Sequence, residues 1–213
     1  MQIYADLPQH LENGDANPEW LILRAGKFTG SDFNQYMSIV NKGELSDTAE
    51  SNLYKKVLES MGYLFDSVRS SAMEQGNELE PYARKEYIEE TFNDVQEVAF
   101  VDWGQMRAGC SPDGVIYDGD TIVKILEIKS PEIKNYIKMA KGKIPKLYEC
   151  QMQFNMLITG AESCDFVVYH PDMKLSIQTI LPDEKWQTDI KDALEKLNAK
   201  YNDILKEIKE LKK

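Results

Sequence analysis

Two β-forming runs on either side of a tight turn constrain the fold of this chain more than any other feature. The runs cover residues 115–117 and 122–128, and Asp118-Gly119-Asp120 lies between them. An Asp-Gly pair between two such runs is a strong local signal for a β-hairpin. The sequence therefore predicts an antiparallel pair of strands in the middle of the chain.

This hairpin is expected to bring two acidic side chains and one amine together. Asp113 stands at the start of the first strand, while Glu127 and Lys129 lie near the end of its partner. Glu127 and Lys129 are two residues apart, so they project from the same face of the strand. Leu126 and Ile128 then point the other way, into the core. Two carboxylates beside an ammonium can hold a cation that polarises a phosphate and acidifies a bound water, which the lysine positions or deprotonates.

The Glu-Ile-Lys triplet carries little information alone, because it occurs three times. Glu132-Ile133-Lys134 follows Pro131 in a loop or at a helix start, and Glu207-Ile208-Lys209 lies on a terminal helix, where a solvated face is expected. Only Glu127–Lys129 ends a strand that faces a Pro-Asp pair. A surface salt bridge is the commoner role of such residues, so the assignment depends on their neighbours.

Hydrophobic periodicity predicts the remaining elements. Helices are expected near 30–40, 47–62, 70–92 and 145–159, with an amphipathic helix from 183 to 213, and strands at 95–101, 166–169 and 175–181. Ser46 or Asp47 is expected to cap the second helix. The order predicts an α/β fold with a central mixed sheet flanked by helices. We expect one domain over 1–213, with a helical part at about 18–92, a catalytic sheet at about 93–181 and a C-terminal helix at about 183–211.

The metal-ligating residue types narrow the choice of cofactor. Three dispersed cysteines (Cys110, Cys150 and Cys164) form no CxxC pair, so a disulfide framework is not expected. Only two histidines, His10 and His170, are present, and His170 precedes Pro171 in a turn, where a structural role is expected. A metal would therefore sit on carboxylates, which favours Mg²⁺, with Mn²⁺ as a substitute.

The formal net charge of −11 opposes nucleic-acid binding, because affinity for phosphate comes mainly from Lys and Arg. A nucleic-acid enzyme of this composition must confine its basic residues to a local channel. No apolar run reaches the ~20 residues that a membrane-spanning helix needs. The N-terminus lacks the features of a signal peptide, so the cytoplasm is the expected location.

Five motifs follow one another in a specific order. They are 20–31 (WLILRAGKFTGS), 73–84 (MEQGNELEPYAR), 111–114 (SPDG), 126–131 (LEIKSP) and 148–153 (YECQMQ). In this order they closely resemble the lambda exonuclease family, also called YqaJ-type viral recombinases, within the PD-(D/E)xK nuclease superfamily. The resemblance runs from about residue 18 to 180. The hairpin is a few residues longer than in lambda exonuclease, a change that affects only a loop.

The resemblance implies a role for each matching residue. Asp113, Glu127, the backbone carbonyl of Ile128 and the helical carboxylate of Glu80 would bind the metal, and Lys129 would activate the water. Without the Glu-Pro-x-Ala-Arg context, Glu80 would be read as a plain surface residue.

Two further groups of residues match the family's motifs. Tyr148, Gln151 and Asn155 share one helix face, and the resemblance assigns Gln151 to holding Lys129 or the water and Tyr148 to lining the site. Arg24, Thr29 and Ser31 resemble the family's pocket for a terminal 5′-phosphate, which a guanidinium and hydroxyls can bind. A helix N-cap is the commoner role for Thr29 or Ser31, and the two roles are compatible.

The resemblance also implies a restriction-endonuclease-like core and Mg²⁺-dependent 5′→3′ degradation of linear duplex DNA during phage-type recombination. It implies mononucleotide release, a toroidal homotrimer, a phage single-strand-annealing protein as partner, and a phage or prophage gene in a bacterial host. A ring would reconcile the acidic exterior with a basic channel.

Three alternatives remain open at this stage. A structure-selective endonuclease of the same superfamily would not need the pocket around Arg24. A non-enzymatic acidic DNA mimic or scaffold fits the charge but leaves Asp113, Glu127 and Lys129 unexplained. An iron–sulfur nuclease is disfavoured, because three cysteines cannot supply four ligands.

Overall fold

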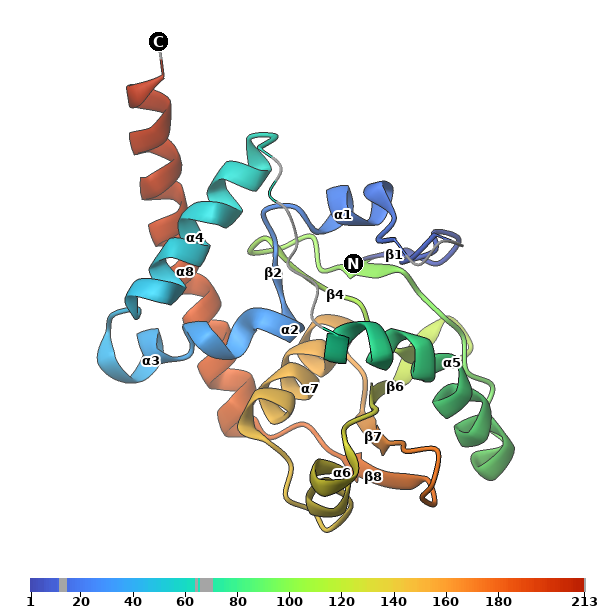
Figure 1. The fold of residues 1–213 in the computed structure, drawn as a ribbon. Helices are drawn as coiled ribbons and strands as arrows, with labels where there is room; N and C mark the ends of the chain where they lie inside the picture. The colour runs from blue at the N-terminus through green and yellow to red at the C-terminus, as the bar shows by residue number, and fades with distance from the viewer. Residues whose placement is uncertain (12–14, 64, 66–70, 213) are drawn as a thin grey trace.

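The computed structural model describes residues 1–11, 15–63, 65 and 71–212, with the backbone alone for 71–74 (Figure 1). The predicted helix at 70–92 and the motif at 73–84 therefore begin partly outside the described residues, and the predicted C-terminal helix loses residue 213 in the same way. Among the described residues, no helix combines the length and the apolar character that crossing a bilayer requires.

The predicted hairpin forms and belongs to a four-stranded mixed sheet. Its strands lie in the order β5 (Gly114–Asp118), β6 (Thr121–Lys129), β7 (Ser163–Val168) and β8 (Ser176–Ile180). The β5–β6 and β7–β8 pairs are antiparallel, while β6 and β7 run parallel. A parallel pair requires a crossover. Here α6 (Ile133–Ala140), which the sequence analysis did not assign as a helix, and α7 (Lys146–Thr159) provide it.

The two faces of β6 pack against different helices. Leu126 and Ile128 join a buried cluster with Ala83 and Tyr87 of α5 (Ser71–Thr91). Ile125 belongs instead to the main core, together with the buried residues of α7. The sheet therefore lies between α5 and α7, and alternate residues of β6 face one helix or the other.

A second, smaller mixed sheet was not expected from the sequence. It contains β1 (Gln2–Tyr4), β3 (Phe100–Asp102), β4 (Ala108–Cys110) and β2 (Phe28–Thr29), in that order. Strands of two or three residues are too short to show an alternating pattern. At Gly109, a Cβ atom would overlap the Phe100 ring, so the close approach of β3 and β4 requires glycine.

The predicted strand at 95–101 was wrong for its first five residues. The regular strand begins only at Phe100. The preceding segment crosses from one sheet to the other: Gln96 forms an isolated bridge with Val115, and the Ala99 N–H donates to the Tyr4 carbonyl at 2.8 Å. The backbone of this segment thus forms hydrogen bonds with strands of both sheets, and not with a single neighbouring strand.

The N-terminal helical part consists mainly of short elements. These are α1 (Pro18–Arg24), α2 (Gly30–Phe33), the 3-10 helix η1 (Asn34–Tyr36), α3 (Ser38–Lys42) and α4 (Asp47–Ser60). The helix predicted at 30–40 is therefore divided, because a tighter turn buries both Phe33 and Tyr36. Ser46, rather than Asp47, caps α4 by accepting from the Ala49 N–H at 3.3 Å.

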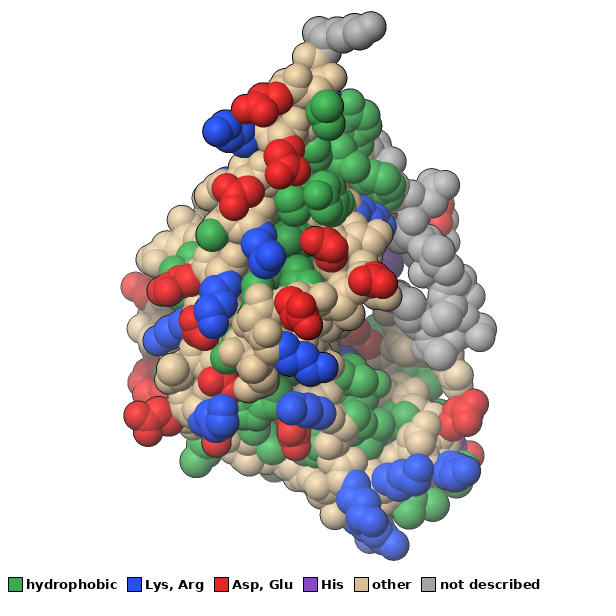
Figure 2. All heavy atoms as spheres, turned by 90° about the vertical axis from the view of Figure 1, so that its left-hand side faces the viewer, with side chains coloured by type: hydrophobic (Ala, Val, Ile, Leu, Met, Phe, Trp, Pro, Cys, Tyr) green, Lys and Arg blue, Asp and Glu red, His purple; other side chains and the backbone are tan. Residues whose placement is uncertain are grey.

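The long C-terminal helix α8 (Glu184–Leu211) packs against α4, and its last turns extend beyond the body of the molecule (Figure 1). Asp183 caps it by accepting from the Trp186 N–H at 2.8 Å. Its predicted apolar stripe is buried as far as Ile204. Beyond that point Leu211 is exposed, as is Tyr63 after the end of α4. Hydrophobic side chains gather in the upper part of Figure 2.

A buried polar cluster attaches α5 to the sheet. Asp165 of β7 accepts from the Tyr87 hydroxyl at 2.6 Å, the Thr179 hydroxyl at 2.7 Å and the Lys124 ammonium at 2.9 Å. Burial alone would raise the pKa of Asp165, but these hydrogen bonds outweigh it and hold the pKa below its usual value. Asp165 is therefore a charged anchor beneath the hydrophobic contact of α5.

Replacing Tyr87 with Phe should destabilise the protein by about 1–3 kcal/mol, because the buried Asp165 carboxylate loses one donor. Urea unfolding followed by circular dichroism measures the change. The matched control is Tyr54→Phe, which removes a hydroxyl from a partly exposed tyrosine of α4. Equal effects of the two substitutions would contradict an anchoring role for Asp165.

Candidate active site

Asp113 is positioned by the first rung of the hairpin. Its backbone N–H donates to the Leu126 carbonyl at 3.1 Å, immediately before β5 begins. Its carboxylate accepts from the Ile128 N–H at 2.6 Å. The side chain of Asp113 therefore reaches across to β6 and contacts the backbone of the residue between Glu127 and Lys129.

Glu127 and Lys129 lie on the face of β6 that packs against α7. Glu127 is fully buried and forms an ion pair with Lys129. Its second carboxylate oxygen accepts from the Asn155 amide at 3.4 Å. The Lys129 ammonium also lies 5.1 Å from the centre of the Tyr148 ring. The structure thus brings Glu127, Lys129 and Tyr148 together.

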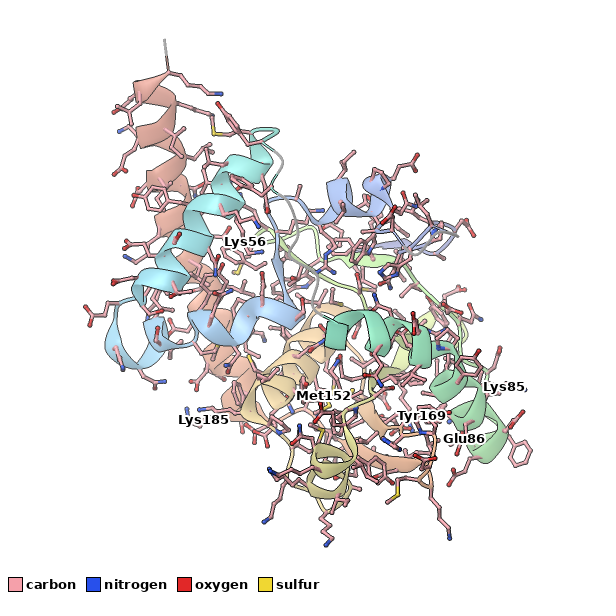
Figure 3. The ribbon with its side chains drawn as sticks, in the orientation of Figure 1. Lys56, Lys85, Glu86, Met152, Tyr169 and Lys185 are labelled. Carbon is pink, nitrogen blue, oxygen red and sulfur yellow. The ribbon has the colours of Figure 1, made fainter. Side chains whose placement is uncertain are left out.

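Arg84 connects the helical carboxylate to the hairpin. It forms an ion pair with Glu80 one turn earlier on α5, and its Nε donates to the Asp113 carbonyl at 2.8 Å. A second ion pair, at 2.8 Å, joins it to Glu97. Lys85, the next residue, projects away from the molecule (Figure 3). Arg84 lies within the motif at 73–84, but the sequence alone indicated no role for it.

Burial raises the pKa of all three carboxyl groups at this site. The pKa of Glu127 rises to about 7, mainly through desolvation, with Asp113 adding to the rise and Lys129 opposing it. The pKa of Glu80 rises to about 8 through desolvation and the nearby Asp113. Desolvation also raises the pKa of Asp113, against the effects of Lys129, the Ile128 N–H and Arg84. Among the described residues, the site therefore holds three carboxyl groups but only two cationic side chains, those of Lys129 and Arg84.

The opposite shift occurs at Lys129. Burial alone would lower the pKa of this amine, but the nearby carboxylates of Glu127 and Asp113 outweigh burial and raise it above its usual value. Lys129 is therefore an ammonium in this arrangement, and it can donate hydrogen bonds.

The donor chemistry of this site fits a hard divalent cation. Carboxylate oxygens are the ligands that Mg²⁺ prefers, and a cation among them would offset the repulsion that raises the pKa values of Glu80 and Glu127. In the part of the chain that the structure describes, no three His, Cys, Asp or Glu side chains already have the geometry of a metal site. Lys129 and Arg84 hold the carboxylates instead.

The inner face of α7 contributes Asn155 to the site, a residue for which the sequence alone indicated no role. Asn155 is buried, donates to Glu127, and has a carbonyl oxygen without a hydrogen-bond partner among the described residues. A Cβ atom at Gly30 would overlap its amide, so glycine in the FTGS motif allows α2 to approach α7. Gln151 is half-buried, and among the described residues its side chain forms no hydrogen bond to Lys129.

The three residues predicted to bind a terminal phosphate lie together. The Arg24 guanidinium donates to the hydroxyls of Thr29 and Ser31, each at 3.4 Å. It also donates to the Ser111 hydroxyl at 3.3 Å, and it lies 4.4 Å from the centre of the Trp20 ring. Ser111 belongs to the motif at 111–114, but the sequence alone did not place it beside Arg24. Thr29 is also the N-cap residue of α2, and the Asp32 carboxylate accepts from both the N–H and the hydroxyl of Thr29.

The hydrogen-bonded cluster around Arg24 lies close in the chain to the carboxylate site. Ser111 contacts Arg24 and stands only two residues before Asp113. Two residues of extended chain span roughly 7 Å at most. A chain of phosphates could therefore place one group on Arg24 and a neighbouring group beside Asp113.

Comparisons with known proteins agree with the fold and the motifs. The sequence model of the YqaJ-like viral recombinase domain matches residues 19–162. The crystal structure of LHK-Exo in complex with dAMP shares 28% sequence identity with this chain and has a TM-score of 0.77. The match covers 91% of this chain and 97% of that chain. The structure of the same alkaline exonuclease from Laribacter hongkongensis is 28% identical, with a TM-score of 0.74 and coverages of 92% and 100%.

A phage-related exonuclease from Haemophilus somnus is similar in fold alone, at 20% identity, with a TM-score of 0.64 and coverages of 85% and 96%. A comparison with curated proteins finds no match. These findings confirm the expected α/β fold of the restriction-endonuclease-like type, with mixed sheets flanked by helices.

The raised pKa of Glu127 predicts how metal-free stability depends on pH. The folded protein binds the Glu127 proton more tightly than the unfolded chain does, so this contribution is complete below the usual pKa of 4.5 and is lost as the pH rises to about 7. Glu127 alone should therefore lower the free energy of unfolding, measured with urea in EDTA, by up to about 1.4 kcal/mol per pH unit between pH 5 and 7.

Glu127→Gln should reduce this dependence on pH, because it removes one of the groups that titrate in the window. Glu195→Gln, on the exposed side of α8, is the control and should preserve it. Parallel curves for the wild type and Glu127→Gln would contradict the assignment.

Proposed function

The chain belongs to the YqaJ-like viral recombinase domain family, and we propose that it is a metal-dependent DNA exonuclease that acts in phage-type homologous recombination. The observation that carries the proposal is the meeting of Asp113, Glu127 and Lys129 in one site, around the fully buried Glu127. The likeness to an alkaline exonuclease over nearly the whole chain supports the same reaction class.

We assign the metal to Asp113, Glu127, the Ile128 carbonyl and Glu80, with Mg²⁺ as the cation and Mn²⁺ as a substitute. When bound, such a cation polarises the scissile phosphate and lowers the pKa of a water molecule. Arg84 supports this arrangement, because it holds both the Asp113 carbonyl and the Glu80 carboxylate. It is therefore a positioning residue rather than a ligand.

Lys129 is assigned to the attacking water. It is an ammonium in this site, so it positions the water and a phosphate oxygen by donating hydrogen bonds to them. Tyr148 forms one wall beneath it, at 5.1 Å from the ammonium. Gln151, on the same face of α7, is available to hold either Lys129 or the water, because its side chain has no hydrogen-bond partner among the described residues.

We assign the pocket of Arg24, Thr29 and Ser31, extended by Ser111, to a terminal 5′-phosphate. A guanidinium with three hydroxyls within hydrogen-bond distance matches the acceptors of such a group. A 5′ end held at Ser111, two residues before Asp113, would favour 5′→3′ removal of nucleotides from linear duplex DNA. A structure-selective endonuclease would have no use for this pocket.

The assembly and the cellular setting are also part of the proposal. We expect a toroidal homotrimer, and the exposed apolar side chains at the ends of α4 and α8, such as Tyr63 and Leu211, support self-association. A ring would keep an acidic exterior around a local basic surface. The expected partner is a phage single-strand-annealing protein, and the expected location is the cytoplasm of a bacterial host.

A time course on end-labelled DNA tests the function directly. Linear duplex should be degraded only with Mg²⁺ or Mn²⁺, and closed circles should stay intact. Cleavage of closed circles would indicate an endonuclease instead. Pure protein without metal-dependent cleavage of any substrate would favour a non-enzymatic, DNA-mimicking role.

Asp113→Ala and Lys129→Ala should each abolish detectable cleavage, because the first removes a metal ligand and the second the amine that positions water. Circular dichroism should show that both variants fold. Lys209→Ala is the matched control, since it alters a second Glu-Ile-Lys triplet on α8. Activity near the wild-type level in either folded site variant would disprove the catalytic assignment.

Arg24→Ala should selectively reduce the preference for 5′-phosphorylated ends, by about tenfold or more if a charge-assisted contact worth roughly 1.5–3 kcal/mol is lost. Initial rates on matched duplexes with and without the phosphate give this ratio. Rates that fall equally on both substrates would show that Arg24 does not recognise the terminal phosphate.

A further inference from the structure

One stretch of this acidic protein is strongly basic. Between Glu132 and Glu149 the chain contains five lysines and no acidic residue. These residues, called here the α6 lysine patch, are Lys134, Lys138, Lys141, Lys143 and Lys146. Without them the formal net charge of −11 would become −16. Positive charge is thus concentrated on α6, the segment that links it to α7, and the first residue of α7.

The patch is exposed and is not neutralised by neighbouring acids. All five lysines are solvent-exposed, and within the part of the chain that the structure describes none of them forms an ion pair. Lysine and arginine side chains gather at the lower edge of Figure 2, at the level where Figure 1 places α6. The charge is therefore available to a partner.

The helix that carries the patch is held firmly on the sheet. Tyr136 and Met139 are buried, and they fix one side of α6. The Tyr136 hydroxyl donates to the Lys174 carbonyl at 2.5 Å, and the Gln178 amide donates to the Met139 carbonyl at 2.9 Å. The opposite side of α6, with Lys134, is presented to solvent in a defined orientation.

Both ends of the basic segment join residues of the candidate active site. Lys134 follows Lys129 by five residues, and Lys146 precedes Tyr148 by two. Extended chain of those lengths spans at most roughly 17 Å and 7 Å. The first and last lysines of the patch therefore lie near Lys129, where β6 ends, and near Tyr148.

We propose that the α6 lysine patch binds the phosphate backbone of the DNA that enters the active site. This rests on the proposed function, which supplies DNA as the substrate. Lys134, Lys138 and Lys141 are spaced i, i+4 and i+7, so they lie along one side of the helix. They span about 10 Å of its axis, a distance over which one DNA strand presents about three phosphates. Because the rest of the chain is acidic, attraction to DNA depends on such a local surface.

The test compares three variants with the wild type. Lys134→Gln/Lys138→Gln/Lys141→Gln removes three charges from the patch, and the corresponding triple Arg variant keeps them. Lys191→Gln/Lys200→Gln/Lys206→Gln removes three exposed charges from α8 as the matched control. Binding to a fluorescent linear duplex is measured in EDTA over a series of salt concentrations, and cleavage is measured with Mg²⁺.

The Gln variant of the patch should reduce the slope of log affinity against log salt by about 2 to 3, and it should weaken binding at low salt roughly tenfold or more. Its KM should rise while kcat at saturating DNA stays within about twofold, since no residue of the carboxylate site changes. The Arg variant and the α8 variant should keep the wild-type slope.

A wild-type slope in the Gln variant, with cleavage intact, would overturn the proposal and leave the patch to contact another protein. An equal loss in the α8 variant would also overturn it, because general charge would then explain the effect. A wild-type protein that neither binds nor cleaves DNA would instead overturn the proposed function.

Discussion

The hydrogen bond from the Ile128 N–H to the Asp113 carboxylate is the contact on which the candidate site depends. It directs an acidic side chain from one strand of a hairpin across to the next, where Glu127 is already buried. Carboxylates in such a place repel one another and lose hydration. The loss of hydration is the main reason why the pKa values of Asp113 and Glu127 are raised. Lys129 and Arg84 compensate only in part, so the arrangement is one that a divalent cation would stabilise.

The surrounding fold keeps this unfavourable group of charges in position. On one face of β6, Leu126 and Ile128 pack on α5, and Asp165 holds the same helix through the Tyr87 hydroxyl. On the other face, Asn155 of α7 contacts Glu127. The alternation of β6 therefore serves two purposes, because one face secures the helix that carries Glu80 while the other carries Glu127 and Lys129.

Charge is distributed as unevenly as polarity. The chain is acidic as a whole, yet the segment between Glu132 and Glu149 is purely basic, and Arg24 stands beside three hydroxyl groups. In the proposed function, a terminal phosphate would contact the cluster around Arg24, the scissile phosphate would contact the carboxylate site, and the backbone beyond it would contact the α6 lysine patch. Because Ser111 and Lys129 link neighbouring surfaces along the chain, one substrate could contact all of them.

By itself the sequence determined the hairpin, the long helices, the family motifs and the residues that gather at the site, because turn chemistry, apolar periodicity and motif order are local signals. It could not locate β1, β2 or β4, whose two or three residues are held by partners far away in the chain. It also could not show that Arg84 holds the Asp113 carbonyl, that Asn155 faces Glu127 or that Ser111 contacts Arg24. Those contacts join separate elements, so only the tertiary packing of α5, α7 and the N-terminal helices against the strands decides them.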